Sequence, residues 1–323
     1  MRMPYPTIVI LAALLISLSG CDNGGGSSST TPEVLASPAR VAAVNSGSSL
    51  VVTDFSENKF CQVDMDTLAV TNCFAAMGKP SGIAYADYLG GRYFVGNRSV
   101  RSVDIFDAQG NFLKHLGGKT GLFDLVNDLA VNEDDEFVYV LDSKSARIDV
   151  YDFEGNLFVS DFTSGGLERP SAIEYGKDGK IYVSDFGDPG IPGTSSLDFE
   201  EVKPSIWVFD ASGSLVDTLV GATSGGMGMP GVSIFSTPQG IYLDSTNNLF
   251  VVDALSGEVQ VYDMNSASPT YMDQLKVIGS LGTGDGELYY PLDVYIDEPE
   301  KDVFITDNQN GRIVVFRGGG LIP

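Results

Sequence analysis

The chain has 323 residues, with 43 aspartate and glutamate residues against 19 lysine and arginine residues and a formal net charge of −24. This acidity argues against a nucleic-acid partner, because phosphate binding needs a basic face. The single histidine excludes zinc fingers, histidine zinc clusters and two-histidine iron centres. A hydrophobic share of 43% is sufficient for a substantial core.

The first 20 residues have the pattern of an export signal. Arg2 supplies a short positive region, and residues 7–18 (TIVILAALLISL) form an uncharged apolar run. The run is shorter than the roughly 20 residues that span a bilayer, and it fits the apolar part of a secretory signal peptide. We therefore expect residues 1–20 to be removed.

The end of this segment, LSGC at Cys21, resembles the lipobox of bacterial lipoproteins. The resemblance implies cleavage before Cys21 and attachment of lipid to its thiol; the alternative is an ordinary signal peptide with a cysteine nearby. Cys21 and the Gly/Ser-rich residues up to 32 then form an anchor and a flexible linker with a reach of about 18 Å. The sequence predicts an extracytoplasmic protein, lipid-anchored to a bacterial membrane at its periplasmic face or at the cell surface.

Two further cysteines, Cys61 and Cys73, flank a turn near Asp66 and Thr67. In such a hairpin the two residues lie opposite each other, and an exported protein meets an oxidising compartment. A cross-strand disulfide is therefore expected, with two buried free thiols as the alternative.

The rest of the chain is built from a repeated unit. A first segment of similar sequence begins at Pro38, Pro80, Val126, Pro170, Pro238 and Pro291. A second segment ends in a polar residue at Asp54, Asn97, Asp142, Asp185, Asp253 and Asp307. A third segment follows in each unit, and a fourth in most. All are rich in Val, Ile, Tyr and Phe and bounded by Gly, Asp or Asn, which is typical of short strands.

Six units of four strands predict an all-β fold, a six-bladed β-propeller that covers residues 33–323. The units resemble NHL repeats, most clearly in the glycine-rich run before Pro291 and in the strands VFITD, ending at Asp307, and RIVVF, beginning at Arg312. The last unit stops after its third strand. We expect the short segment Glu33 to Leu35 to supply the missing outer strand and to close the ring.

In a propeller the first strand of a blade starts on the face at which the second strand ends. Two long insertions fall on this upper face, at residues 186–204 and 221–237, and neighbouring long loops are typical of a binding surface. The alternative is neutral loop growth. The candidate binding residues are Phe186, Met227, Met229, Phe235 and Gln239.

The polar residue that ends each second strand, an aspartate in five units and Asn97 in the other, is expected to be structural, because a residue that every blade shares serves the fold. An aspartate there accepts hydrogen bonds from backbone N–H groups of the following turn.

Positions that break the sixfold pattern are better candidates for function. Asn127, Asp128, Glu174 and Asp293 lie on first strands, which border the channel, and oxygen ligands of this kind suit Ca²⁺. The alternative is that Arg40 and water neutralise these carboxylates.

These observations leave two hypotheses from different classes. One is a tethered binding or scaffold module for another cell-envelope protein, a peptide or a glycan. The other is a Ca²⁺-dependent hydrolase or lactonase similar to the gluconolactonase propellers, in which metal polarises a substrate oxygen. His115, the only histidine, lies in an expected outer strand, which excludes a histidine-based mechanism. Fold alone does not decide between them.

Overall fold

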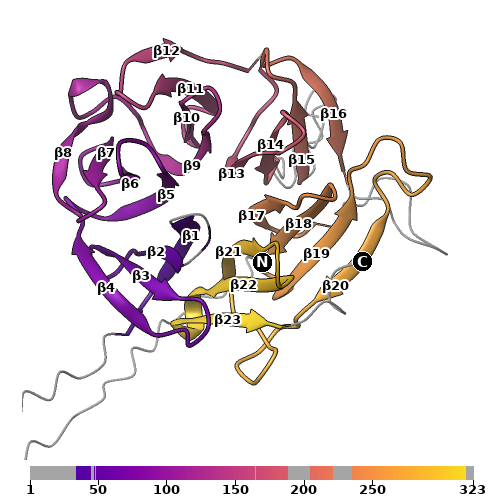
Figure 1. Cartoon of the computed structure of the whole chain (residues 1–323). Coiled ribbons are helices and arrows are strands. Elements are labelled where there is room, and N and C mark those ends of the chain that lie inside the picture. Colours follow the sequence, from indigo (N-terminus) through magenta and orange to yellow (C-terminus); the bar gives the residue numbers. More distant parts are fainter. Residues whose placement is uncertain are drawn as a thin grey trace, which may run out of the picture. The chain divides into compact units, whose positions relative to one another are not determined.

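The computed structural model describes residues 34–44, 47, 49–163, 165–187, 204–220 and 235–317. In these ranges 23 strands form six antiparallel sheets arranged in a ring (Figure 1). The predicted six-bladed β-propeller is therefore confirmed. The described helices are two short 3-10 segments, Leu116–Gly118 and Asn308–Asn310. No helix in the described ranges is long and apolar enough to cross a membrane.

Each blade runs outward in chain order from an inner strand. Blade one contains β1 (Pro38–Val44), β2 (Ser49–Asp54), β3 (Lys59–Asp64) and β4 (Val70–Ala75). Blade two contains β5 (Pro80–Ala86), β6 (Arg92–Asn97), β7 (Ser102–Asp107) and β8 (Phe112–His115). Blade three contains β9 (Val126–Asn132), β10 (Phe137–Asp142), β11 (Arg147–Asp152) and β12 (Leu157–Val159).

The remaining three blades follow the same order. Blade four contains β13 (Pro170–Tyr175), β14 (Ile181–Asp185), β15 (Ser205–Phe209) and β16 (Leu215–Leu219). Blade five contains β17 (Pro238–Leu243), β18 (Asn248–Asp253), β19 (Glu258–Asp263) and β20 (Gln274–Ile278). Blade six contains β21 (Pro291–Asp297), β22 (Asp302–Asp307) and β23 (Arg312–Phe316).

The inner strands begin at the six residues where the repeat begins, and five of these residues are prolines. A proline is tolerated at the first position of a strand because no ladder N–H is needed there. The register of every inner strand then shifts between its first and its third or fourth residue. Next to this irregularity, the second residue of the inner strand lines the upper end of the channel in five of the six blades: Ala39, Ser81, Asn127, Gln239 and Leu292.

Hydrophobic side chains fill the junctions between neighbouring blades. Six buried clusters are present, one at each junction of the ring. Phe94 belongs to the cluster between blades two and three, and Phe304 belongs to the one between blades six and one. Burial of one such side chain stabilises the fold by roughly 1.5–3 kcal/mol. Both faces of a sheet are thus covered only when the ring is complete.

The repeated aspartates hold the entry of each blade. The buried carboxylate of Asp142 accepts hydrogen bonds from the backbone N–H groups of Asp124 and Leu125, both at 2.8 Å. Asp54, Asp185 and Asp253 receive two N–H groups from the equivalent segments of their own blades. The structural role is confirmed, but the main donors precede the first strand, whereas the following turn was expected to supply them.

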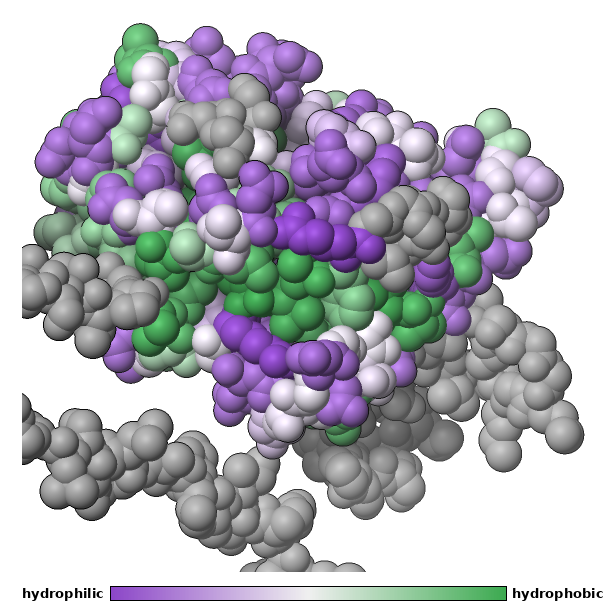
Figure 2. Space-filling model, turned by 60° about the horizontal axis from the view of Figure 1, so that its bottom comes forward, coloured by the Kyte–Doolittle hydropathy of each residue, from purple (hydrophilic) through white to green (hydrophobic). Residues whose placement is uncertain are grey.

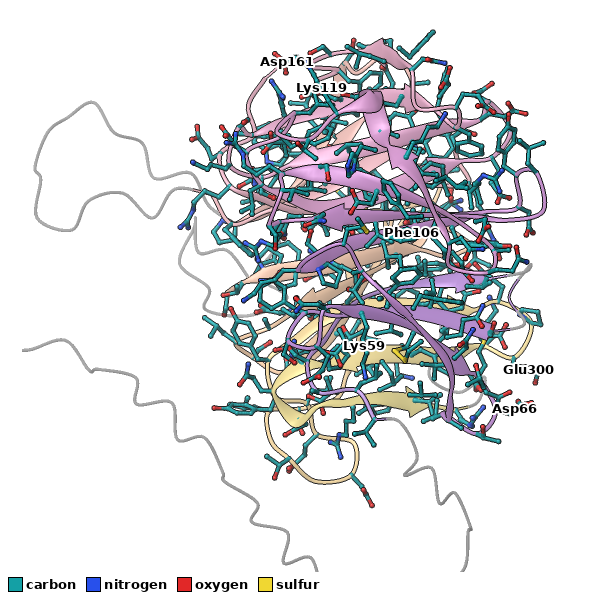
Figure 3. The ribbon with its side chains drawn as sticks, turned by 90° about the vertical axis from the view of Figure 1, so that its left-hand side faces the viewer. Lys59, Asp66, Phe106, Lys119, Asp161 and Glu300 are labelled. Carbon is teal, nitrogen blue, oxygen red and sulfur yellow. A yellow bond between two sulfur atoms is a disulfide. The ribbon has the colours of Figure 1, made fainter. Side chains whose placement is uncertain are left out.

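The predicted disulfide is confirmed. Cys61 in β3 and Cys73 in β4 are directly opposite each other in the strand register and are bonded (Figure 3). The bond ties the outermost strand of blade one to its neighbour.

Blade six has three strands in the described ranges, and the predicted outer strand is wrong for Val34 and Leu35. Leu35 packs instead into the hydrophobic cluster between blades six and one. The backbone N–H groups of the next residues, Ala36 and Ser37, donate hydrogen bonds to Asp54. The physical reason is that this segment donates backbone N–H groups to the aspartate of blade one, as the equivalent segments do in blades three, four and five. Glu33 lies outside the described residues.

The ring is closed by contacts between blade six and β1. Thr306 donates its hydroxyl to the carbonyl of Ala39 at 3.0 Å, and Asn308 donates its amide to the carbonyl of Pro38 at 2.9 Å. All five residues of β23 remain partly exposed, and apolar surface is visible on this side of the molecule (Figure 2).

The disulfide gives a direct test of this arrangement. A protein with Cys61→Ala and Cys73→Ala should lose about 3 kcal/mol of unfolding free energy, because the two cysteines are 12 positions apart in the sequence and the closed loop restricts the unfolded chain. Urea denaturation of the oxidised protein, the reduced protein and the double variant measures the difference. Equal midpoints for all three would contradict the expectation.

Candidate functional site

The inner strands enclose a channel that is divided into an upper and a lower cavity. The upper cavity, of about 800 Å³, is lined by the starts of inner strands and by residues that follow second strands. The lower cavity, of about 950 Å³, is lined by the later residues of the inner strands. Arg40 lines the upper cavity, while Asp128 and Asp293 line the lower one, so these three residues lie at the division.

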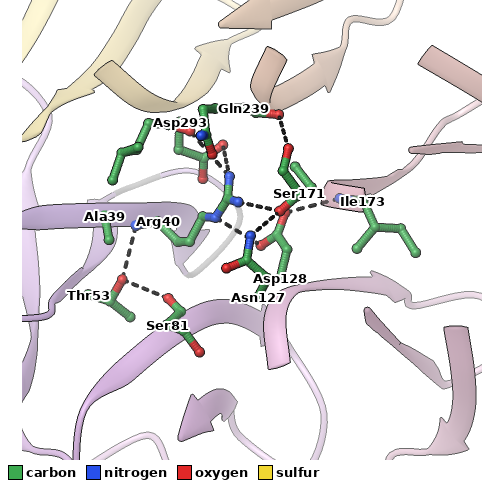
Figure 4. Close-up of polar contacts among 12 residues, drawn as sticks. Ala39, Arg40, Thr53, Ser81, Asn127, Asp128, Ser171, Ile173, Gln239 and Asp293 are labelled. Atoms are coloured by element: carbon green, nitrogen blue, oxygen red, sulfur yellow. Dashed lines mark hydrogen bonds and ion pairs between the residues drawn. The ribbon is translucent and has the colours of Figure 1, made fainter. Parts of the chain in front are cut away.

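Arg40 reaches across the channel. Its side chain starts on β1 in blade one, and its guanidinium donates to the carbonyls of Ser171 in blade four and Leu292 in blade six (Figure 4). Its nitrogens lie 3.7 Å from a carboxylate oxygen of Asp128 and 3.7 Å from one of Asp293. Arg40 is 4% exposed, so this charge is almost entirely removed from water.

The two aspartates also join neighbouring blades. Asp128 accepts the backbone N–H of Ile173 at 3.1 Å, and Asp293 accepts that of Val41 at 2.9 Å. Each carboxylate therefore bonds to the fourth residue of the next inner strand and faces Arg40 with its other oxygen. Charged groups at this depth are tolerated because both kinds of partner are present.

Titration of these carboxyl groups is shifted. Burial raises the pKa of Asp293 to about 7, against the lowering effect of Arg40, and burial also raises the pKa of Asp128. Glu174, which lines the lower cavity, has a pKa well above its ordinary value because of burial and the nearby Asp293 and Asp128.

This geometry does not support the candidate Ca²⁺ site. The cation that Asp128 and Asp293 face is Arg40, and the Asn127 amide donates to the carbonyl of Ser171 at 2.6 Å. Among the described residues no group of three or more His, Cys, Asp or Glu is placed to hold a metal ion. Glu174 lines the lower cavity, whereas Asn127 lines the upper one, so the four candidate ligands are divided between the two.

The upper cavity carries basic and aromatic side chains despite the acidity of the chain. Four basic residues and one carboxylate line it: Arg40, Arg98, Lys144, Arg169 and Glu168. Three aromatic residues line it as well: Phe55, Phe186 and Tyr290. The lower cavity has the opposite character, with seven carboxylates and one lysine: Asp87, Asp128, Glu133, Asp134, Glu174, Asp178, Asp293 and Lys177.

Two aromatic rings support the cations of the upper cavity. The guanidinium of Arg98 lies over the ring of Phe55, with 5.5 Å to the centroid, and that of Arg169 lies over Phe186 at 5.9 Å. Arg169 also donates to the carbonyl of Gly187 at 2.6 Å. Such contacts orient a guanidinium while leaving N–H groups for a ligand.

The candidate upper-face residues have different outcomes. Phe186 and Gln239 line the upper cavity. Phe235 is wrong as a surface residue, because it is 3% exposed and packs edge-on against Tyr262 in the core between blades four and five. Met227 and Met229 lie outside the described residues.

The sequence analysis missed Phe55, Arg98 and Lys144. Each follows the polar residue that ends a second strand, at once or one residue later. The residue directly after the second strand carries the signal, because only phenylalanine occurs there twice in the six units: Phe55, Arg98, Ser143, Phe186, Ala254 and Asn308. His115 lies on β8 as expected, with its Nδ1 2.8 Å from a carboxylate oxygen of Asp104.

Three solved structures are similar to the chain. Hydrazine synthase of Kuenenia stuttgartiensis matches with a TM-score of 0.60 and 17% identity, covering 93% of this chain and 100% of that one. A structural genomics protein of unknown function from Bacteroides thetaiotaomicron matches with 0.63 and 16%, covering 92% and 72%. A chain of the nidogen/laminin complex matches with 0.57 and 17%, covering 83% and 93%.

At these identities the similarity shows a shared fold. No protein-family model matches the chain, and no curated protein is similar to it in sequence. The resemblance to NHL repeats therefore stays a prediction.

The division of the channel can be tested through Arg40. An Arg40→Met variant should lose about 3–5 kcal/mol of stability near neutral pH, because two buried carboxylates lose their cation. Arg40 lowers the pKa of both Asp128 and Asp293, so its removal raises both further above the ordinary value of 3.8. A carboxyl group whose pKa is raised in the folded state stabilises the fold at low pH, and this stability is lost as the pH rises through the folded-state pKa. The stability difference between Arg40→Met and the original protein should therefore grow from about pH 6 to about pH 9.

Urea midpoints across this pH range measure the effect. Lys114→Met, which removes an exposed charge on β8, is the control and should change stability little at every pH. A loss in Arg40→Met that does not depend on pH would contradict the coupling to the carboxylates.

Proposed function

We propose that this protein is an extracytoplasmic, membrane-tethered binding module that holds a ligand or partner segment in its upper cavity. The observation that carries the proposal is the upper cavity itself. Its wall is made of side chains that differ from blade to blade, whereas the residues that build the fold repeat. A concave site with aromatic walls and a few polar groups is the usual form of a ligand pocket.

The sequence at the N-terminus supports the tether. The apolar run, Cys21 and the Gly/Ser-rich linker have the order of a lipoprotein signal, anchor and leash. The disulfide between Cys61 and Cys73 agrees with an oxidising compartment. A linker with a reach of about 18 Å would let the ring turn toward a partner near the membrane surface.

Binding is favoured over hydrolysis because of Arg40. A metal-dependent mechanism needs an open coordination position facing the substrate. The carboxylates best placed for one, Asp128 and Asp293, face a guanidinium that is itself fixed by two backbone carbonyls. The upper cavity offers hydrogen-bond donors and rings, which are the groups of a binding site.

The tether is tested by replacing its anchor. In a bacterial host, the full chain should incorporate radiolabelled palmitate and sediment with membranes, and Cys21→Ala should do neither. The propeller should still fold, since its first strand begins at Pro38, and thermal melting of the released protein checks this. Membrane association that survives Cys21→Ala would contradict a lipid anchor.

The binding face is tested by site-specific photocrosslinking in the same host. A photoreactive phenylalanine at Phe186 or Gln309, both at the upper cavity, should give a discrete crosslinked species. The same probe at Asp178, at the lower cavity, or at the exposed Phe158 of β12 is the matched control and should not. Addition of EDTA should leave the upper crosslinks unchanged; crosslinks equal at all four positions would refute the assignment.

A further inference from the structure

The upper cavity contains a guanidinium without an anionic partner. The side chain of Arg98 makes no hydrogen bond and no ion pair with any described residue. Its guanidinium makes a cation–π contact with the ring of Phe55. The surrounding protein partly desolvates it and Arg40 lies nearby, and both effects lower the pKa of Arg98. Arg98 is exposed and lines the cavity, so its guanidinium is accessible to a ligand from solvent.

A second, neutral donor lies in the same cavity. The hydroxyl of Ser143 is shielded from solvent and has no hydrogen-bond partner in the described part of the chain. It lines the upper cavity beside Lys144. A hydroxyl left unpaired in this way costs free energy unless a ligand accepts its proton.

Part of the remaining wall is apolar, and part is polar: Ser37, Ser81, Asn127, Gln239, Asn308 and Gln309. Leu125, Pro170 and Leu292 line the cavity between the cations, together with the ring of Tyr290. These apolar residues offer no donor to an inorganic anion such as phosphate, whose oxygens would stay unpaired against them. An organic ligand with one anionic group can bury its apolar body against this wall.

From these contacts we infer that the upper cavity binds an organic carboxylate, with the carboxylate on Arg98 and an aromatic or aliphatic body against the apolar wall. The planar fork of a guanidinium matches a carboxylate with two parallel hydrogen bonds. Ser143 adds an unpaired hydroxyl to the wall of the same cavity, and Arg169, which lies over Phe186, adds a second positive charge. The inference rests on the proposed function, because it names the ligand class of that site.

The test uses two peptides that differ in one charge, acetyl-Phe-Glu-Phe-amide and acetyl-Phe-Gln-Phe-amide, and calorimetric titration into the disulfide-bonded protein. The glutamate peptide should bind at least about tenfold more tightly. Raising NaCl from about 0.05 M to about 0.5 M should reduce the difference, because the shorter Debye length screens the charges. Benzoate shows whether a small aromatic acid is sufficient, and sodium phosphate tests an inorganic anion.

Arg98→Gln should abolish the preference for the glutamate peptide while changing thermal stability little, since the Arg98 side chain makes no hydrogen bond or ion pair with the described residues and only the ring contact with Phe55 is lost. Ser143→Ala should reduce the preference severalfold. Lys114→Gln removes the same charge from the outer strand β8 and is the matched control, which should bind like the original protein.

Three results would overturn the inference: equal binding of the two peptides, phosphate binding as tight as that of the glutamate peptide, or no binding of either carboxylate ligand at millimolar concentration. Upper-face crosslinks that persist in any of these cases would leave the binding module standing with another ligand class. Their absence would remove both.

Discussion

The arrangement of the channel depends on one buried charge. Arg40 extends from blade one to the carbonyl of Ser171 in blade four, and it lies between two carboxylates that are each 6% exposed. Removing three charges from water is costly, and the attraction between them does not by itself offset the cost. The hydrogen bonds to Ser171, Leu292 and two backbone N–H groups complete the arrangement, and together they separate the upper cavity from the lower one.

The third residues of the inner strands show how the ring accommodates this charge. In blade order they are Arg40, Gly82, Asp128, Ala172, Gly240 and Asp293. Glycine followed by aspartate thus occurs twice, three blades apart. A Cβ atom on Gly82 would lie 2.7 Å from the Cα of Asp128, and one on Gly240 would lie 2.5 Å from the Cα of Asp293, so both positions require glycine.

The pattern is broken in the blade that follows each aspartate. Ala172 follows Asp128, whereas Arg40 follows Asp293 around the ring. One arginine therefore serves two aspartates that are related by half a turn of the ring. The small side chain of Ala172 is compatible with the arrival of the guanidinium at the neighbouring Ser171. This asymmetry explains why two symmetry-related carboxylates share one buried cation, Arg40, which is the single buried lysine or arginine among the described residues.

The repeats predicted the fold closely because their signal is local. Strand starts, such as Pro80 and Pro170, and strand ends, such as Asp142, are set by backbone hydrogen bonds that every blade needs. The site was predicted less well, because it depends on which residues of distant blades meet. A pattern of oxygen ligands gives the same sequence signal whether a metal or Arg40 lies between them. Phe235 was misassigned for a similar reason, since the sequence of a loop does not show whether an apolar side chain packs into the core or faces solvent.

The two mouths of the channel have opposite charge, and this bears on what the upper one can bind. A net charge of −24 repels an anion at long range, so the overall field does not favour its approach. At physiological ionic strength that field decays over about 8 Å, whereas Arg98 and Arg169 act by direct contact. Anions that interact by charge alone therefore gain little from this protein. A ligand that also buries an apolar body against Leu125 and Leu292 gains free energy that salt does not screen, and the upper cavity selects for such a ligand.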